Sequence, residues 1–159
     1  MKGTALISDC KKYRYILSRI WDSSLPSVTF LMLNPSTADA DKDDPTIRRC
    51  INYAKAWGFG HLDVVNLFAY RATDPKKLLE SDDPIGEMNI YSIYTACKTG
   101  EYTVCAWGNS SIVDKLLRKF PDYKPLKDVE NLKFLEMSKD GTPKHPLYLP
   151  KNLKPFDFR

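Results

Sequence analysis

Short apolar runs alternate with amphipathic segments through the middle of the chain. Four runs of six or seven residues predict strands, because they are rich in Val, Ile, Leu and Phe and end at polar or turn-forming residues. The first three are apolar on both faces, which is typical of strands in a sheet that helices cover on both sides. The predicted strands are Val28–Leu33, Leu62–Phe68, Tyr102–Trp107 and Leu132–Met137.

Amphipathic segments between these strands predict three helices. Asp followed by Pro is a favourable start, because Asp caps the free N–H groups and Pro suits the first helical position. The predicted starts are Asp44-Pro45, Asp83-Pro84 with an apolar face through Ile85, Met88, Tyr91 and Thr95, and Asn109 or Ser110. The repeated order of strand and helix predicts right-handed crossovers and a largely parallel sheet.

The N-terminal segment predicts a small β-hairpin, in which Tyr13–Trp21 pairs with Thr4–Ser8. No linker or repeat divides the chain, and 159 residues suit one domain with one core. We therefore expect a single α/β domain over residues 1–159. Its predicted architecture is a three-layer α/β/α arrangement around a central four-stranded, mostly parallel sheet, with the hairpin beside it.

Composition is that of an ordinary globular protein, with 43% hydrophobic and 28% charged residues. No apolar run approaches the length of roughly 18–20 residues that a membrane span needs, and the first residues lack the apolar stretch of a signal peptide. A cytoplasmic protein without a membrane partner is expected. The net charge of +4 permits a nucleic-acid partner without requiring one.

Cysteine spacing argues against a metal cluster or a disulfide framework. The four cysteines contain no Cys-x-x-Cys pair, and neither of the two histidines lies near one of them. We therefore expect free thiols, no metal and no cofactor. The acidic run Asp39, Asp41, Asp43 and Asp44 is interpreted as a solvated loop ending in a helix cap, with a magnesium site as the minority alternative.

Polar segments follow all four predicted strands. In open parallel sheets ligands bind at the carboxyl ends of the strands, so these segments should meet at one rim. They are Leu33–Asp39, Asn66–Thr73, Ala106–Ser110 and Lys144–Tyr148.

Two side chains in these segments suggest chemistry. Asn66 interrupts an apolar strand, and a buried amide without partners costs roughly 1–3 kcal/mol, so it has either a structural hydrogen-bonding role or a binding role. His145 lies in a loop and suits a general acid or a donor to developing negative charge, with a surface residue as the alternative. We interpret His61 as structural. The sequence has no Ser-His-Asp pattern, Walker loop or dinucleotide fingerprint.

The motifs resemble those of an uncharacterised family. The matching stretches are LNPSTAD, DDPTIRRC, WGFG, NLFAYRAT, AWGN and HPLYLP. Together they resemble the family called domain of unknown function 1643, from Leu31 to Pro150.

A more distant similarity is to the uracil-DNA glycosylase superfamily, whose landmarks occur in the same order. That superfamily has an Asp-Pro or Asn-Pro after the first core strand, a base-reading Asn, a Trp-Gly and a late His-Pro. The counterparts here are Asn34-Pro35, Asn66, Trp107-Gly108 and His145-Pro146. The resemblance implies that Asn34 positions water, Asn66 reads the edge of a base and His145 stabilises negative charge on the departing base.

Departures from that pattern bear on specificity. Ser36, Thr37 and Ala38 stand where uracil-selective members have a bulky aromatic residue, which implies a roomier pocket. Leu33 replaces the usual glycine. Arg71 and Lys144 are expected to contact phosphates. The candidate catalytic residues are Asn34 and His145, and the candidate substrate-binding residues are Pro35, Ser36, Thr37, Asn66, Tyr70, Arg71, Trp107, Asn109 and Lys144.

The leading hypothesis is a hydrolase of N-glycosidic bonds that acts on a nucleobase, modified or not, in DNA or a nucleotide. The alternative is a module on the same fold that binds a nucleotide or nucleic acid without catalysis. A weaker third hypothesis is metal-dependent phosphoryl transfer through Asp39, Asp41 and Asp43.

Overall fold

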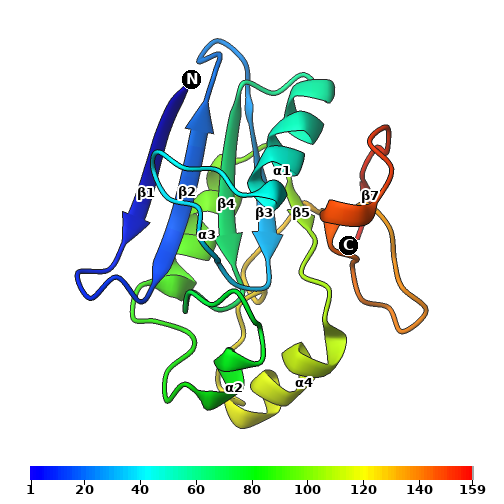
Figure 1. The fold of residues 1–159 in the computed structure, drawn as a ribbon. Helices are drawn as coiled ribbons and strands as arrows, with labels where there is room; N and C mark the ends of the chain where they lie inside the picture. The colour runs from blue at the N-terminus through cyan, green and yellow to red at the C-terminus, as the bar shows by residue number, and fades with distance from the viewer. Residues whose placement is uncertain (159) are drawn as a thin grey trace.

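Seven strands form one mixed sheet in the order β1-β2-β4-β3-β5-β6-β7 (Figure 1). The computed structural model describes residues 1–158, apart from the side chain of Ser110. The strands are β1 (Lys2–Ile7), β2 (Arg14–Ile20), β3 (Ser27–Met32), β4 (His61–Asn66), β5 (Thr103–Cys105), β6 (Leu132–Phe134) and β7 (Phe156–Asp157). The helices are α1 (Pro45–Ala56), α2 (Lys77–Glu80), α3 (Asn89–Thr99), α4 (Ser110–Lys119) and the 3-10 turn η1 (Pro146–Tyr148).

The four strands predicted from apolar runs form the parallel centre of the sheet. β3 pairs in parallel with β4 and β5, and β5 pairs in parallel with β6. The expected four-stranded sheet is wrong, because both edges are extended by antiparallel strands. The N-terminal hairpin is part of the sheet since β2 pairs with β4, where Leu17 lies opposite Val64. β7 has two residues, too few to leave a pattern in the sequence.

A register shift interrupts the hairpin at the start of β2. Leu6 pairs with Ile16, but the next residue of β1, Ile7, pairs with Arg14. One extra residue, Tyr15, is therefore accommodated in β2, as in a β-bulge. Because side chains alternate across a strand, the extra residue puts Arg14 on the same side of the sheet as Leu17.

Helices cover the two faces of the sheet, each over its own apolar cluster. Along β3, Phe30 and Met32 pack in the cluster that contains residues of α1, whereas Leu31 packs in the cluster that contains residues of α3 and α4. α1 begins as predicted, since the Asp44 carboxylate accepts a hydrogen bond of 2.9 Å from the Ile47 N–H. Among the described residues, no helix combines the length and apolar character needed to cross a membrane.

The predicted start of the second long helix is wrong. Asp83 closes a turn instead, because its carboxylate accepts the N–H groups two and three residues further on. α3 starts at Asn89, after Gly86, whose φ of +90° cannot belong to a right-handed helix. Met88 and Tyr91, expected on the buried face, are 42% and 64% exposed. Polar residues such as Asn89 occupy that face, so apolar periodicity pointed to the wrong side.

The connections after β3 and β5 leave the sheet on opposite faces. The chain from β3 runs into α1 on one face. The chain from β5 runs into α4, which lies beyond the carboxyl ends of the strands (Figure 1) and packs in the apolar cluster of the other face. Neighbouring parallel strands whose connections diverge leave a crevice beyond their carboxyl ends, which is where ligands bind in such sheets.

Candidate functional site

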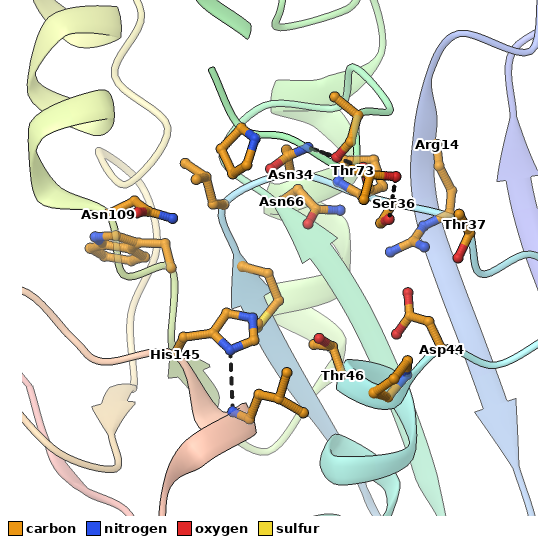
Figure 2. Close-up of a pocket in the computed structure, with 18 of the residues that line it drawn as sticks. Arg14, Asn34, Ser36, Thr37, Asp44, Thr46, Asn66, Thr73, Asn109 and His145 are labelled. Carbon is orange, nitrogen blue, oxygen red and sulfur yellow. Dashed lines mark hydrogen bonds between the residues drawn. The ribbon is translucent and has the colours of Figure 1, made fainter. Parts of the chain in front are cut away.

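A cavity of about 540 Å³ lies at this divergence, beyond the carboxyl ends of β3, β4 and β5 (Figure 2). Its volume is within the range of roughly 300–1,000 Å³ that is typical of small-molecule sites. The polar segments expected to meet at one rim do meet here. The candidate residues that line the cavity are Asn34, Pro35, Ser36, Thr37, Asn66, Trp107, Asn109 and His145.

Tyr70, Arg71 and Lys144 lie outside this cavity. Tyr70 and Arg71 line a separate surface depression beside α2. The Arg71 guanidinium donates to the Ser36 carbonyl at 3.4 Å. It therefore contacts a residue of the cavity wall without lining the cavity itself. Lys144 forms an ion pair of 2.7 Å with Glu136 at the surface. We predicted these residues as part of the site because their neighbours along the chain belong to it. Their side chains lie outside the cavity.

Asn66 presents an unpartnered amide to the cavity. It ends β4 opposite Met32 and is 1% exposed. Neither its Nδ2 nor its Oδ1 has a hydrogen-bond partner among the described residues. An unsatisfied buried amide is costly and rare in native proteins, so it indicates a missing partner. One donor and one acceptor side by side match a ligand edge of the same kind.

Asn34 is fixed in one orientation by the backbone around it. Its Nδ2 donates to the carbonyls of Pro35 at 3.1 Å and Ala72 at 2.8 Å. The amide oxygen is therefore directed away from these carbonyls and is available as an acceptor. A carboxylate here would face two carbonyl oxygens, which explains why this position suits Asn.

His145 offers one ring nitrogen to the cavity. Its Nδ1 accepts a hydrogen bond of 3.2 Å from the Leu147 N–H, and its other nitrogen faces the cavity (Figure 2). Burial lowers the pKa of His145, with a smaller opposing effect of the Asp44 carboxylate. The imidazole is thus neutral at pH 7, and since Nδ1 accepts, the proton is on Nε2. His145 is a neutral donor directed at the ligand space.

Two other elements hold His145 in place. Arg49 of α1 donates to the carbonyls of Leu147 and Leu149, both at 2.9 Å, and so fixes η1 against the helix. Gly108 follows Trp107 with a φ of +58°, and a Cβ there would lie 3.5 Å from the Cβ of His145. The left-handed turn needs glycine and brings the β5 loop against the histidine.

Sequence reasoning missed Arg14, Asp44 and Thr46, which also line the cavity. Arg14 is 2% exposed, and its Nη1 donates to the Ala38 carbonyl at 3.1 Å. Burial lowers the pKa of its guanidinium to about 10, and the nearby Asp44 carboxylate opposes that shift. In the sequence, Arg14 stands between Tyr13 and Tyr15 in the predicted hairpin. It was missed because that hairpin was expected to lie apart from the site.

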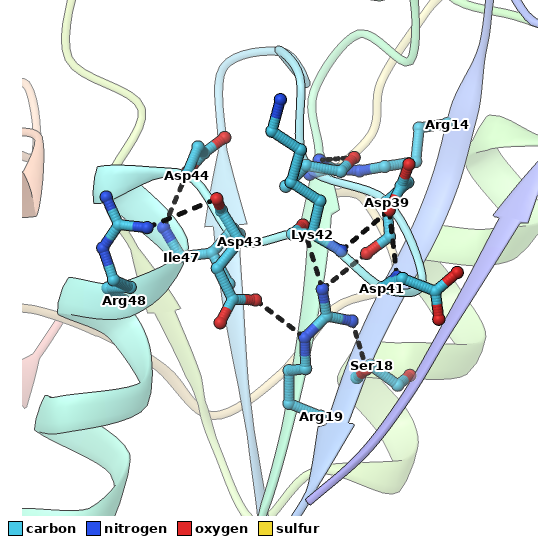
Figure 3. A network of polar contacts seen from close by, with 11 residues as sticks. Arg14, Ser18, Arg19, Asp39, Asp41, Lys42, Asp43, Asp44, Ile47 and Arg48 are labelled. Atoms are coloured by element: carbon cyan, nitrogen blue, oxygen red, sulfur yellow. Dashed lines mark hydrogen bonds and ion pairs between the residues drawn. The ribbon is translucent and has the colours of Figure 1, made fainter.

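The loop between β3 and α1 is held by a second buried arginine of β2 (Figure 3). Arg19 is 3% exposed, and its Nε pairs with the Asp43 carboxylate at 2.9 Å. Its other nitrogens donate to the carbonyls of Ser18, Asp39 and Lys42. These contacts fix the loop that carries Asn34 at one end and Asp44 at the other.

Three of the acidic residues of this loop, Asp39, Asp43 and Asp44, have structural roles. The Asp39 carboxylate accepts the N–H groups of Asp41 at 2.9 Å and Lys42 at 2.8 Å, and these bonds lower its pKa. Asp43 pairs with Arg19, and Asp44 caps α1. In the part of the chain that the structure describes, no three His, Cys, Asp or Glu side chains are grouped so as to hold a metal ion.

Arg19→Ala should destabilise the protein by about 2–4 kcal/mol, because the Asp43 charge and several carbonyls lose their buried partner. Urea unfolding measures this change. The control is Arg48→Ala on the exposed side of α1, which should stay within about 0.5 kcal/mol of the parent. Equal stability of the two variants would show that Arg19 does not hold the loop.

Asn66→Leu should stabilise the ligand-free protein by about 1–3 kcal/mol, since it replaces two unsatisfied buried atoms by methyl groups on a side chain with the same branching, beside a cavity. Asn89→Leu is the matched control. The Asn89 Nδ2 donates to the carbonyls of Asn66 and Leu67 and to the Tyr123 hydroxyl, so its loss should destabilise. Thermal and urea unfolding should move in opposite directions for the two variants, and a destabilised Asn66→Leu would indicate a structural amide.

His145 should titrate below the ordinary histidine value of about 6.5 and carry its neutral proton on Nε2. The unfolded chain takes up this proton first as pH falls, so stability should decline with pH below about 6.5 and less so in His145→Gln. Long-range ¹H–¹⁵N spectra report tautomer and pKa, with His61→Gln for assignment. A proton on Nδ1, or a pKa above 6.5, would contradict the neutral donor.

Residues 14–147 match the model of a family described as "Protein of unknown function (DUF1643)". No curated protein and no solved structure matches the chain. The similarity to uracil-DNA glycosylases therefore stays an interpretation of short motifs. The family match runs from Arg14 to Leu147 and includes most residues of the cavity wall. The chain belongs to the DUF1643 family.

Proposed function

We propose that the cavity binds a nucleobase and that the protein hydrolyses the N-glycosidic bond of that base, in DNA or in a nucleotide. The observation that carries the proposal is the orphaned amide of Asn66 at the cavity wall. Nucleobases present neighbouring donors and acceptors along one edge, which is what a fixed amide complements. The oxygen of Asn34 and the Nε2–H of His145 complete the set of groups that this chemistry requires.

Hydrolysis of this bond develops positive charge on the sugar and negative charge on the base. A water oxygen bonds to the anomeric carbon, the bond to the base nitrogen breaks, and its electron pair leaves with the base. The proton that the water loses passes to solvent, and the departed base takes up a proton from solvent. Asn34 can orient the water by accepting one of its hydrogens. His145 can donate Nε2–H to the departing base, and a preorganised donor of this kind is typically worth a factor of about 10²–10³ in rate.

The architecture supports the same proposal. Four parallel strands lie at the centre of the sheet, and α1 and α3 pack on opposite faces. This arrangement fits a three-layer fold like that of uracil-DNA glycosylases, with the cavity at the corresponding end. Small side chains at Ser36 and Thr37 leave room for a substituted base. A base in duplex DNA has to be flipped to reach such a site, at a cost of a few kcal/mol.

A non-catalytic binding module is the second candidate. The observation that favours it is the state of Asn34, which carries no charge and whose Nδ2 is already bonded to backbone carbonyls. An amide held in this way orients water but does not remove its proton.

Base release decides between these candidates. Mass spectrometry would follow free base from single- and double-stranded DNA containing uracil or modified pyrimidines, and from a nucleotide pool. We expect release that falls about 10²–10³-fold in His145→Ala and also falls in Asn34→Ala. His61→Ala is the control outside the cavity and should retain the parent rate.

No release, together with thermal stabilisation by nucleotides that Asn66→Leu abolishes, would favour the binding module. Neither release nor stabilisation by any of these compounds would refute both candidates.

A further inference from the structure

Arg14 is a buried cation at the wall of the cavity. It is 2% exposed, and among the described residues it has no ion pair. Its Nη1 donates to the Ala38 carbonyl, while its buried Nε has no hydrogen-bond partner in the part of the chain that the structure describes. Arginine is almost never fully buried unless it is paired, because desolvating the charge is costly. Since Arg14 lines the cavity, a ligand can supply the missing acceptor.

The fold directs this side chain toward the cavity. The extra residue at Tyr15 changes the register of β2 between Ile16 and Arg14, so Arg14 faces the loop that forms the cavity wall. Bulges of this kind often re-aim a side chain beside a functional site. The pairing of β1 with β2 therefore determines the side of the sheet on which Arg14 lies.

Asp44 lies close to Arg14 on the same side of the cavity, across from His145 and Asn109 (Figure 2). One carboxylate oxygen caps α1, and the other has no partner among the described residues. The two side chains do not form an ion pair with each other. A guanidinium and a carboxylate thus face the same space as separate donor and acceptor groups.

We infer that Arg14 and Asp44 form a second subsite of the cavity, which binds a hydroxyl-bearing group of the ligand. A hydroxyl accepts a hydrogen bond from the guanidinium and donates one to the carboxylate. An anion would be attracted by Arg14 but repelled by Asp44. A cation would be attracted by Asp44 but repelled by Arg14. The inference rests on the proposed function in that Asn66 and His145 of the same cavity hold the base. The hydroxyl belongs either to the sugar or to a substituent on the base.

Matched nucleosides separate these two sources. Calorimetric titration of the full chain would compare uridine with 2′-deoxyuridine, and 5-hydroxymethyl-2′-deoxyuridine with thymidine. In at least one pair, we expect the member with the additional hydroxyl to bind about tenfold more tightly, as one hydrogen bond to a charged group allows. The first pair reports a sugar hydroxyl and the second a hydroxyl on the base.

Two variants test the subsite itself. Asp44→Asn keeps a side-chain oxygen that can cap α1 but removes the negative charge. Arg14→Lys keeps the positive charge but removes the planar set of N–H donors of the guanidinium. Both should reduce the preference to about twofold or less. Asp41→Asn and Arg48→Lys, two exposed positions outside the cavity, should retain it. Equal affinities within both pairs, or a preference that survives in both variants, would overturn the inference.

A probe without a base distinguishes failure of the subsite from failure of the proposed function. The Nε–H signal of Arg14 can be followed by ¹H–¹⁵N NMR during addition of D-ribose or inorganic phosphate. A ribose-dependent shift that Asp44→Asn abolishes would support the subsite even if no nucleoside binds. No response to ribose, or a response to phosphate that saturates at lower concentration, would overturn it.

Discussion

The contacts of Arg19 are the constraint on which the cavity depends. The chain between β3 and α1 has no regular structure from Leu33 to Asp44, yet it supplies a whole wall of the cavity. One guanidinium reaches two carbonyls of this loop, those of Asp39 and Lys42, and the Asp43 carboxylate. Because Arg19 extends from β2, which pairs with β4, it ties the loop to the sheet. Asn34 and Asp44 are fixed at its two ends.

Of the five buried side-chain atoms without a hydrogen-bond partner among the described residues, three belong to Arg14 and Asn66 at the cavity wall. Asn66 and Asn89 are both buried amides at the junction of β4 and α3. The Asn89 Nδ2 donates to the carbonyls of Asn66 and Leu67 and thereby secures the end of β4. Among the described residues, the Asn89 Oδ1 and both polar atoms of the Asn66 side chain have no partner. One amide thus stabilises the strand end from which the other projects. A preorganised binding site is expected to have unpaired polar groups whose positions are fixed by hydrogen bonds between neighbouring residues.

Much of the fold could be predicted because its causes are local. Strands buried on both faces leave continuous apolar runs, and the Asp44-Pro45 start of α1 needs only adjacent residues. Parallel order then brought Asn34, Asn66 and His145 together. The errors have non-local causes. The buried face of α3 carries polar residues that bond to other elements, and Lys144 turns to a carboxylate eight positions away. Arg14 reached the site only because the hairpin joined the sheet.

The bulge at Tyr15 determines which side of the sheet Arg14 faces, and therefore whether its charge reaches the cavity. In a regular strand an odd separation places two side chains on opposite sides, and Arg14 and Arg19 are five positions apart. One inserted residue cancels that rule, so both cations meet the same loop, one holding it and one lining the space behind it. A single-residue deletion here would keep every charge of the chain but leave the cavity without its cation. The electrostatics of this pocket are therefore encoded in a count of residues as much as in their identity.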